Sequence, residues 1–146
     1  MANECIIRRM TMADVDGVAA VEAATFPTPW SRDAFASEMN NVAARYLVAE
    51  LDGEIIGFAG AWLILDESHI TNIAVLAAHR GQKIGRRLTE GLMQYLSNLG
   101  AAYVTLEVRK YSNGCFSLLF MASSSILAFM CSCSPFSSLI TTLNTK

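Results

Sequence analysis

The chain has 146 residues, enough for one domain with a single core, and its formal net charge is −2. This balance gives no indication of a general affinity for nucleic acid, so a basic stretch must be interpreted locally. The first residues, "MANECIIRRMTMADVDG", carry acids and no apolar segment of signal-peptide length, so we expect a cytoplasmic protein. The four cysteines show no zinc-site spacing, which predicts free thiols and no metal.

The first third of the chain predicts one strand followed by two helices. The alternation and β-branched residues of "ECIIRRMT" are typical of a short strand over residues 4–11. "TMAD" resembles a capping box and predicts the start of a helix over residues 13–26. Ser31 is placed to cap a second helix over residues 32–41.

The middle of the chain predicts three strands. "RYLVAEL" and "EIIGFAGAWLIL" are apolar strands over residues 45–51 and 54–65, and the Asp-Gly pair between them is a strong hairpin signal. "SHITNIAVL" predicts a further strand over residues 68–76.

A long helix and one more strand follow. The helix is predicted over residues 81–100, where Gly100 closes it. Its apolar residues recur at helical spacing: Ile84, Leu88, Leu92 and Leu96. "AAYVTLEVR" predicts a strand over residues 101–109, parallel to the one before the helix if the connection is a right-handed crossover. The order of elements indicates an α/β (α+β) domain in which a mixed sheet carries helices on its faces.

A basic turn, "HRGQKIGRRL" at residues 79–88, begins the long helix and allows two interpretations. Helix N-terminal amides carry partial positive charge and glycine lets a ligand approach the backbone, as in a pyrophosphate site. Alternatively, the stretch is only the solvated, basic start of a surface helix. Short glycine motifs have many chance matches, so spacing alone favours the second interpretation.

The end of the chain differs in composition, since residues 111–145 contain no Asp, Glu, Lys or Arg and many serines. Residues 115–134 are long enough for a membrane span but are Ser-rich and lack flanking cations on the far side. A buried helix and strand is a second interpretation. We favour a third, in which a divergent or shifted-frame tail replaces the ordinary end of the domain.

Several motifs in order resemble one known family. "HITNIAVLAAHRGQKIGRRLTEGLM" and "GAAYVTLEVRKYSN" resemble the acetyl-CoA core of the GNAT acetyltransferases, and "TFPTPWS" with "LEVR" resembles its ribosomal-protein-alanine N-acetyltransferases. The resemblance covers residues 4–113 and implies a core over residues 1–113, followed by an atypical Ser-rich tail over residues 114–146. It implies a GNAT-like, mostly antiparallel sheet with missing or altered C-terminal strands.

The resemblance implies transfer of acetyl from acetyl-CoA, a co-substrate, to the N-terminal alanine amine of a small-subunit ribosomal protein. It implies a peptide partner, with no direct nucleic-acid contact and no membrane association. Two alternatives stay open: a non-catalytic remnant that binds acetyl-CoA, and an acetyltransferase with another amine substrate.

The resemblance also implies which residues hold acetyl-CoA. The backbone of Ile73, Ala74 and Val75 would align the pantetheine arm like an added strand, and one outward-facing amide would polarise the thioester carbonyl. The amides of one loop would hold the pyrophosphate, and these loop residues are Gly81, Gln82, Lys83, Ile84, Gly85 and Arg86. Asn113 matches an asparagine that contacts the cofactor.

Lys83 occupies a position at which the family pattern has glycine. If the backbone there requires a positive φ, the side chain costs about 1 kcal/mol. Its Cβ also narrows the approach to phosphate, so we expect weaker cofactor binding that the lysine charge offsets only in part.

Glu107 is the predicted catalytic residue. It ends an apolar strand, where desolvation would raise the pKa of its carboxyl and make it a better base. The residues alone favour an ion pair with Arg109 or Arg45, whereas the resemblance implies a base that takes a proton from the acceptor ammonium.

The general acid of the family has no counterpart. Its tyrosine would fall at Phe120, which cannot donate a proton, so this half of the mechanism is missing. His69 and His79 are alternative bases, although exposed histidines at strand ends are commoner. Phe26 and Trp30 would line the peptide groove.

Overall fold

The computed structural model describes residues 3–107, 119–122, 125–128 and 140–144. The described residues form eight strands: β1 (Ile6–Arg9), β2 (Ala44–Leu51), β3 (Glu54–Ile64), β4 (Glu67–Val75), β5 (Tyr103–Glu107), β6 (Leu119–Ala122), β7 (Ser125–Ala128) and β8 (Ile140–Asn144). The helical elements are two 3-10 turns and three α-helices: η1 (Met12–Asp14), α1 (Val15–Thr25), α2 (Arg32–Met39), η2 (Ala77–His79) and α3 (Ile84–Asn98).

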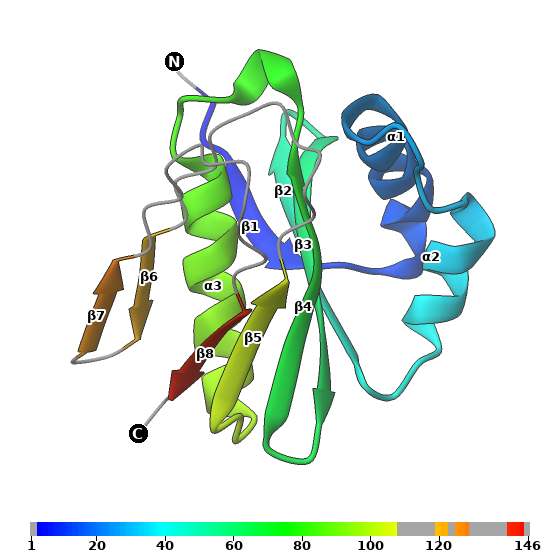
Figure 1. The fold of residues 1–146 in the computed structure, drawn as a ribbon. Coiled ribbons are helices and arrows are strands. Elements are labelled where there is room, and N and C mark those ends of the chain that lie inside the picture. The colour runs from blue at the N-terminus through cyan, green and yellow to red at the C-terminus, as the bar shows by residue number, and fades with distance from the viewer. Residues whose placement is uncertain (1–2, 108–118, 123–124, 129–139, 145–146) are drawn as a thin grey trace.

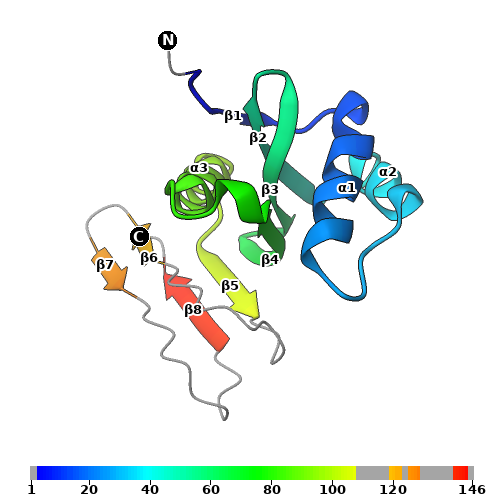
Figure 2. The ribbon, with the colours of Figure 1, turned by 90° about the horizontal axis from the view of Figure 1, so that it is seen from above.

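One six-stranded sheet forms the centre of the molecule, in the order β1-β2-β3-β4-β5-β8 (Figure 1). α3 covers one face, and α1 and α2 cover the other, as the view from above shows (Figure 2). β4 and β5 are parallel, while the other neighbouring strands of this sheet are antiparallel. This arrangement confirms the predicted mixed, mostly antiparallel sheet with helices on both faces and the crossover through α3.

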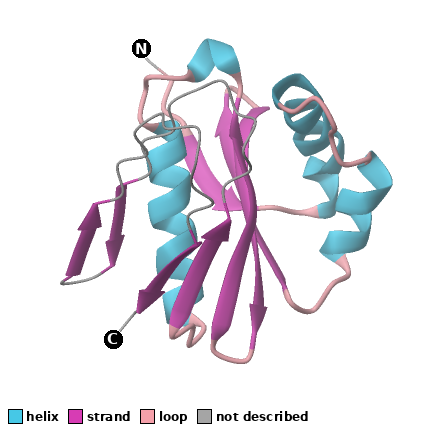
Figure 3. Cartoon of the chain, in the orientation of Figure 1, coloured by secondary structure: helices cyan, strands magenta, loops and turns pink. Residues whose placement is uncertain are grey.

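The C-terminal segment contributes strands of its own (Figure 3). β8 pairs with β5 at the edge of the main sheet, and β6 and β7 form a separate two-stranded ladder. These three strands lie within the tail for which the sequence predicted missing or altered strands. Most of the segment considered as a membrane span, residues 115–134, lies outside the described residues.

Two cores flank the sheet and differ in chemistry. The core under α3 is aliphatic, and among its members are Leu47, Ile56, Leu88, Leu92 and Leu96. The core under α1 and α2 is centred on Phe35, whose ring meets those of Phe58 and Tyr46 edge to face, with 5.5 and 6.4 Å between centroids. Such edge-to-face pairs add to the free energy that burial alone supplies.

Two predicted chain reversals are confirmed. Asp52 and Gly53 both have positive φ values, 54° and 80°, as a two-residue hairpin turn between β2 and β3 requires. Gly100, at φ 94°, follows α3, and the amide of Ala101 donates to the carbonyl of Leu96 at 3.0 Å. This bond closes α3 in a Schellman motif.

The start of α3 lies three residues later than the sequence predicted. The helix begins at Ile84, and residues 81–83 form a loop. Gly81 and Lys83 have φ values of 79° and 62°, which are left-handed and incompatible with a right-handed helix. The basic stretch is therefore a loop followed by a helix start, rather than a continuous helix.

An ion-paired turn opens α1. The guanidinium of Arg8 donates to both carboxylate oxygens of Asp14, at 2.7 and 2.8 Å, and the Thr11 amide donates to the same carboxylate at 2.8 Å. The hydrogen bonds from Arg8 are the main cause that lowers the pKa of Asp14 to about 2. The predicted capping box of Thr11 and Asp14 is present, and the turn that it begins is the 3-10 turn η1, which leads into α1.

Within the described ranges, no helix combines the length and apolar character needed to cross a bilayer. The same ranges contain no group of three or more His, Cys, Asp or Glu residues arranged for a metal ion. Cys5 is a free thiol. The other three cysteines lie outside the described residues.

Candidate functional site

β4 separates from β5 halfway along its length. Residues 67–70 of β4 pair with β5, and Thr71 is then an extra residue, because the register with β3 passes from Ile70 to Asn72 across adjacent residues of β3. Such a bulge bends and twists its strand. Residues 72–75 continue to pair with β3, and the described strands supply no partner on their other edge.

The backbone groups that reach this open edge follow from the alternation of an antiparallel ladder. The amide of Leu76 donates to the carbonyl of Ile56 at 2.8 Å, so Ala74 also bonds to β3, while Ile73 and Val75 face away from it. The Val75 carbonyl accordingly accepts a hydrogen bond from Arg80 Nε, at 3.2 Å, outside the ladder. Of the three predicted pantetheine residues, Ile73 and Val75 present backbone groups at the open edge.

A loop with unused amides lies beyond the end of β4. Among the described residues, no acceptor is present for the backbone amides of five consecutive positions: Gly81, Gln82, Lys83, Ile84 and Gly85. These amides belong to the N-terminus of α3, where the helix dipole favours an anion. The cationic side chains of Arg80, Lys83, Arg86 and Arg87 are exposed around them. This set of donors fits a pyrophosphate group.

Lys83 has the positive φ that the sequence analysis considered, and a side chain at this φ carries a cost in conformational free energy. Its φ of 62° and ψ of 18° place it in the left-handed region, immediately before the first residue of α3. A non-glycine residue costs about 1 kcal/mol in this conformation. Gly81 is also left-handed, and a Cβ built there meets no atom within 4 Å, so open space adjoins the loop.

Of three further predicted residues, the structure describes the backbone of Glu107 and Phe120 and does not describe Asn113. Glu107 ends β5 one residue after Leu106, the partner of Ile70, so its backbone lies where β4 and β5 separate. Asn113 lies outside the described residues, and Phe120 is described through the backbone of β6, where it pairs with Leu127. The proposed roles of these residues stay predictions.

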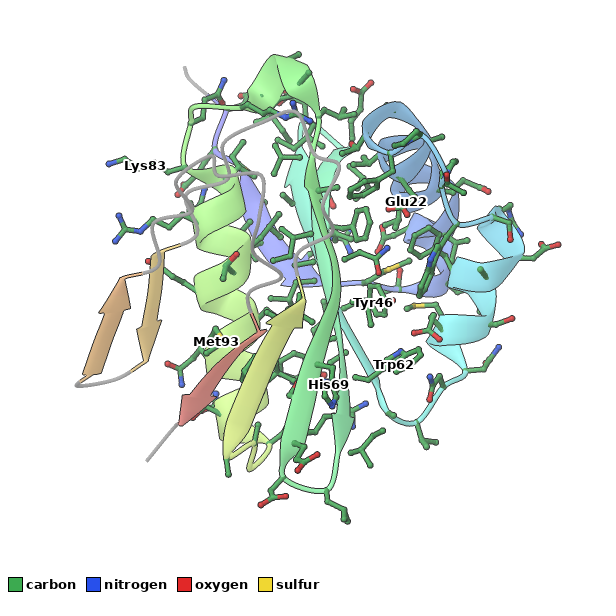
Figure 4. All side chains as sticks on the ribbon, in the orientation of Figure 1. Glu22, Tyr46, Trp62, His69, Lys83 and Met93 are labelled. Atoms are coloured by element: carbon green, nitrogen blue, oxygen red, sulfur yellow. The ribbon has the colours of Figure 1, made fainter. Side chains whose placement is uncertain are left out.

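The opposite face of β4 carries a buried carboxylate that the sequence analysis missed. Glu22 of α1 is 2% exposed and accepts hydrogen bonds from the Trp30 amide at 3.3 Å and from Asn72 Nδ2 at 3.3 and 3.4 Å. Figure 4 shows Glu22 between α1 and β4, and Lys83 on the other side at the start of α3. Glu22 therefore joins α1, the segment before α2 and β4.

Tyr46 and Glu38 form a second polar group on the face of the sheet that contains Glu22. The Tyr46 hydroxyl donates to Glu38 Oε2 and shares a hydrogen bond with Thr71 Oγ1, both at 3.3 Å. Trp62 Nε1 also donates to Glu38 Oε2, at 2.5 Å. Burial raises the pKa of the Tyr46 phenol above its ordinary value. Tyr46 is therefore neutral at physiological pH. The acidic side chains of Glu22 and Glu38 both lie on this face of the sheet.

The helical spacing of the buried residues in α1 is the sequence signal that indicates a buried Glu22. It follows Val15 by seven residues and Val18 by four, so it lies on the buried stripe of α1, where an acid requires partners. Asn72 has a weaker signal, as the second of two polar residues within an apolar strand. The predicted groove residue Trp30 packs against Phe35, with ring centroids 5.6 Å apart, and His69 is exposed on β4.

The comparisons with known proteins agree with this geometry. The model of the acetyltransferase (GNAT) family matches residues 15–115. A Bacillus subtilis protein is 37% identical over 110 residues, covering 75% of this chain and 73% of its own, and its name provisionally gives ribosomal protein bS18-alanine N-acetyltransferase activity.

Solved structures show the same fold. The crystal structure of the ribosomal-protein-S18-alanine N-acetyltransferase from Escherichia coli matches with a TM-score of 0.69 and 31% identity, over 76% of this chain and 70% of that one. The PaiA N-acetyltransferase from Thermoplasma acidophilum, solved with coenzyme A, matches in fold with a TM-score of 0.67 and 17% identity, over 75% and 82% of the two chains. The chain thus belongs to the GNAT family of acetyl-CoA-dependent N-acetyltransferases.

Proposed function

We propose that this protein transfers the acetyl group of acetyl-CoA to the N-terminal alanine amine of ribosomal protein bS18. The relatives from B. subtilis and E. coli support this substrate, because both names give that reaction. The observation that carries the donor half is the open edge of β4 at Ile73 and Val75, which leads to the unpaired amides at the start of α3.

The donor half uses mainly the backbone. The amides of residues 81–86 hold the pyrophosphate, and the groups of Ile73 and Val75 that face the open edge bind the pantetheine arm. Acetyl-CoA supplies the reactive thioester. The Ile73 amide donates to the thioester carbonyl oxygen and stabilises the negative charge that develops on it during attack.

The acceptor half requires a neutral amine. Glu107 takes a proton from the acceptor ammonium, directly or through water, and such a base contributes about 10²–10⁴-fold to the rate. The amine nitrogen then forms a bond to the carbonyl carbon, the carbon–sulfur bond breaks, the CoA thiolate leaves, and the nitrogen loses its second proton to water to give the amide. Phe120 cannot protonate the thiolate, so water supplies that proton and we expect slower turnover than in relatives with a tyrosine.

The proposal is tested with the full chain, acetyl-CoA and a peptide with the N-terminal sequence of bS18. Mass spectrometry should show a single acetyl group on the peptide's α-amine, and a peptide with a blocked N-terminus should gain none. Acetylation of lysine side chains instead would support another amine substrate. A rise in Tm with CoA but no acetylation of any amine would support the non-catalytic remnant.

Glu107→Gln tests the predicted base. We expect the variant to lose at least about tenfold in kcat, in keeping with the loss of a positioned base, while its Tm still rises with CoA. An unchanged kcat would show that Glu107 is structural.

A further inference from the structure

The side-chain amide of Asn72 is held in one orientation. Its Nδ2 group donates to both carboxylate oxygens of Glu22, at 3.3 and 3.4 Å. An ionised carboxylate can only accept hydrogen bonds, so it selects the amide rotamer in which nitrogen faces it and oxygen faces away. Within the described structure, Asn72 Oδ1 is buried and has no hydrogen-bond partner.

A buried acceptor without a partner destabilises the folded protein, because the hydrogen bonds to water that it loses on burial are not replaced. Such a group in a folded protein calls for an explanation, and a ligand that donates a hydrogen bond is one. The Glu22 contact makes the cost unavoidable, because rotating the amide would place its oxygen against the carboxylate.

The bulge at Thr71 places Asn72 beside the proposed reaction centre. Ile70 and Ile73 pack into the core under α3, whereas Thr71 and Asn72 both contact residues on the α1 and α2 face. Asn72 is therefore next in sequence to Ile73, whose amide faces the open edge, but its side chain points to the other face of the sheet.

The face that Asn72 shares with Glu22 suits an incoming amine. The start of α3, where the donor's pyrophosphate would bind, lies on the other side of β4 (Figure 4). An amine must reach the thioester from a side that the donor does not occupy. The side chains of Glu22 and Glu38 lie on this side, where their oxygens accept hydrogen bonds.

We propose that Asn72 Oδ1 accepts a hydrogen bond from the acceptor amine, and that Glu22 is a positioning residue that orients Asn72 for this contact. The inference rests on the proposed acetyl transfer and names the side chain that holds the nucleophile. Orientation of an amine toward a carbonyl carbon is a large part of such catalysis, and displacement by about 1 Å can cost about 10²-fold.

Steady-state kinetics on the full chain test the proposal. In Glu22→Gln the new side chain can donate as well as accept, so it no longer selects the orientation of Asn72. We expect Glu22→Gln and Asn72→Ala each to lower kcat with the bS18 peptide by about tenfold to a hundredfold, with the KM for acetyl-CoA unchanged. The double variant should lose no more than Asn72→Ala alone, because both changes remove one contact.

Matched controls separate this effect from general damage. Glu54→Gln and Asn98→Ala make the same chemical changes at exposed positions and should keep the kcat of the unaltered protein. Each variant's rise in Tm with CoA should equal that of the unaltered protein. A purely structural Glu22 would lower Tm without a selective loss of kcat, and that result would overturn the proposal.

A spectroscopic readout does not depend on turnover. The ¹⁵N-labelled Asn72 side-chain amide, assigned by its loss in Asn72→Ala, should shift when the bS18 peptide is added to the CoA complex, and this response should vanish in Glu22→Gln. No shift, or an equal shift in Glu22→Gln, would overturn the inference. Absence of acetylation by the unaltered protein would count against the proposed function alone, since this resonance still reports the contact with the peptide amine.

Discussion

The two faces of the sheet differ in their cores and in the polar groups beside them. Backbone amides lie near one face, and buried polar side chains lie on the other. Under α3 the core is aliphatic, and the adjoining loop has backbone amides without an acceptor among the described residues. Under α1 and α2 the core is aromatic and contains the buried side chain of Glu22 and the hydroxyl of Tyr46. A backbone amide is present at a position whichever residue other than proline occupies it, whereas a side-chain network depends on each residue that forms it.

Removing one large side chain from each core tests whether the two faces of the sheet act separately. Phe35→Ala should lower the free energy of unfolding by about 3–5 kcal/mol and Leu88→Ala by about 2–5 kcal/mol, because both residues are fully buried. Urea denaturation measures both values. Below its Tm, Phe35→Ala should keep its stabilisation by CoA, while Leu88→Ala, one turn into α3, should lose part of it. Equal loss in both variants would contradict a division between the faces.

Gly60→Ala should have the next largest effect. A Cβ at this position would lie 2.1 Å from a ring carbon of Tyr46, so the buried ring or β3 must move. We expect a loss of about 3 kcal/mol, at the upper end for overpacking. Gly85→Ala is the control, because its Cβ would be 3.7 Å from Val75, an ordinary contact. Similar Tm values for the two variants would show that the Tyr46 ring adapts.

The Asp14 carboxyl, at the start of α1, makes the stability of the fold depend on pH. Its folded-state pKa, about 2, lies below the ordinary value of 3.8. The carboxylate therefore stabilises the fold fully above about pH 4, by roughly 2 kcal/mol, and this contribution disappears as the pH falls toward 2. Asp14→Asn should lower stability at pH 7 and flatten its dependence between pH 4 and 2. Parallel stability curves for the two proteins over that range would contradict this assignment.

Substitution of Lys83, at the start of α3, should change stability least. Lys83→Gly should raise stability by about 1 kcal/mol, because glycine adopts the left-handed conformation without strain. Isothermal titration with CoA should show tighter binding to Lys83→Gly and weaker binding to Lys83→Ala, which keeps the strain and loses the charge. Weaker binding to both would mean that the charge outweighs the backbone cost.

Much of the fold follows from local patterns in the sequence. The apolar spacing of α3, the Asp52-Gly53 turn and the Gly100 cap are each determined by residues near one another in the chain. The parallel pairing of β4 with β5 follows from the crossover connection through α3. The motifs around Ile73 and Gly81 also sufficed to indicate the family.

Other features depend on contacts between distant residues. Glu22 and Asn72 are 50 positions apart, so no local pattern shows that they meet. The bulge at Thr71 leaves only a weak mark in the sequence, two consecutive polar residues within an otherwise apolar strand. The start of α3 was misplaced because lysine rarely adopts the left-handed conformation that Lys83 has. The role of Glu107 stays a prediction.

The bulge in β4 also determines which kinds of mutation this strand can accept. Substitutions at Thr71 or Asn72 alter one face and leave the aliphatic core in place. Deletion of Thr71 would leave Asn72 and the later side chains of β4 on their present faces, because Ile70 and Asn72 already pair with adjacent residues of β3. During evolution, this strand can therefore lose a residue at the bulge without exchanging its two faces, but it would lose the bend that the bulge produces.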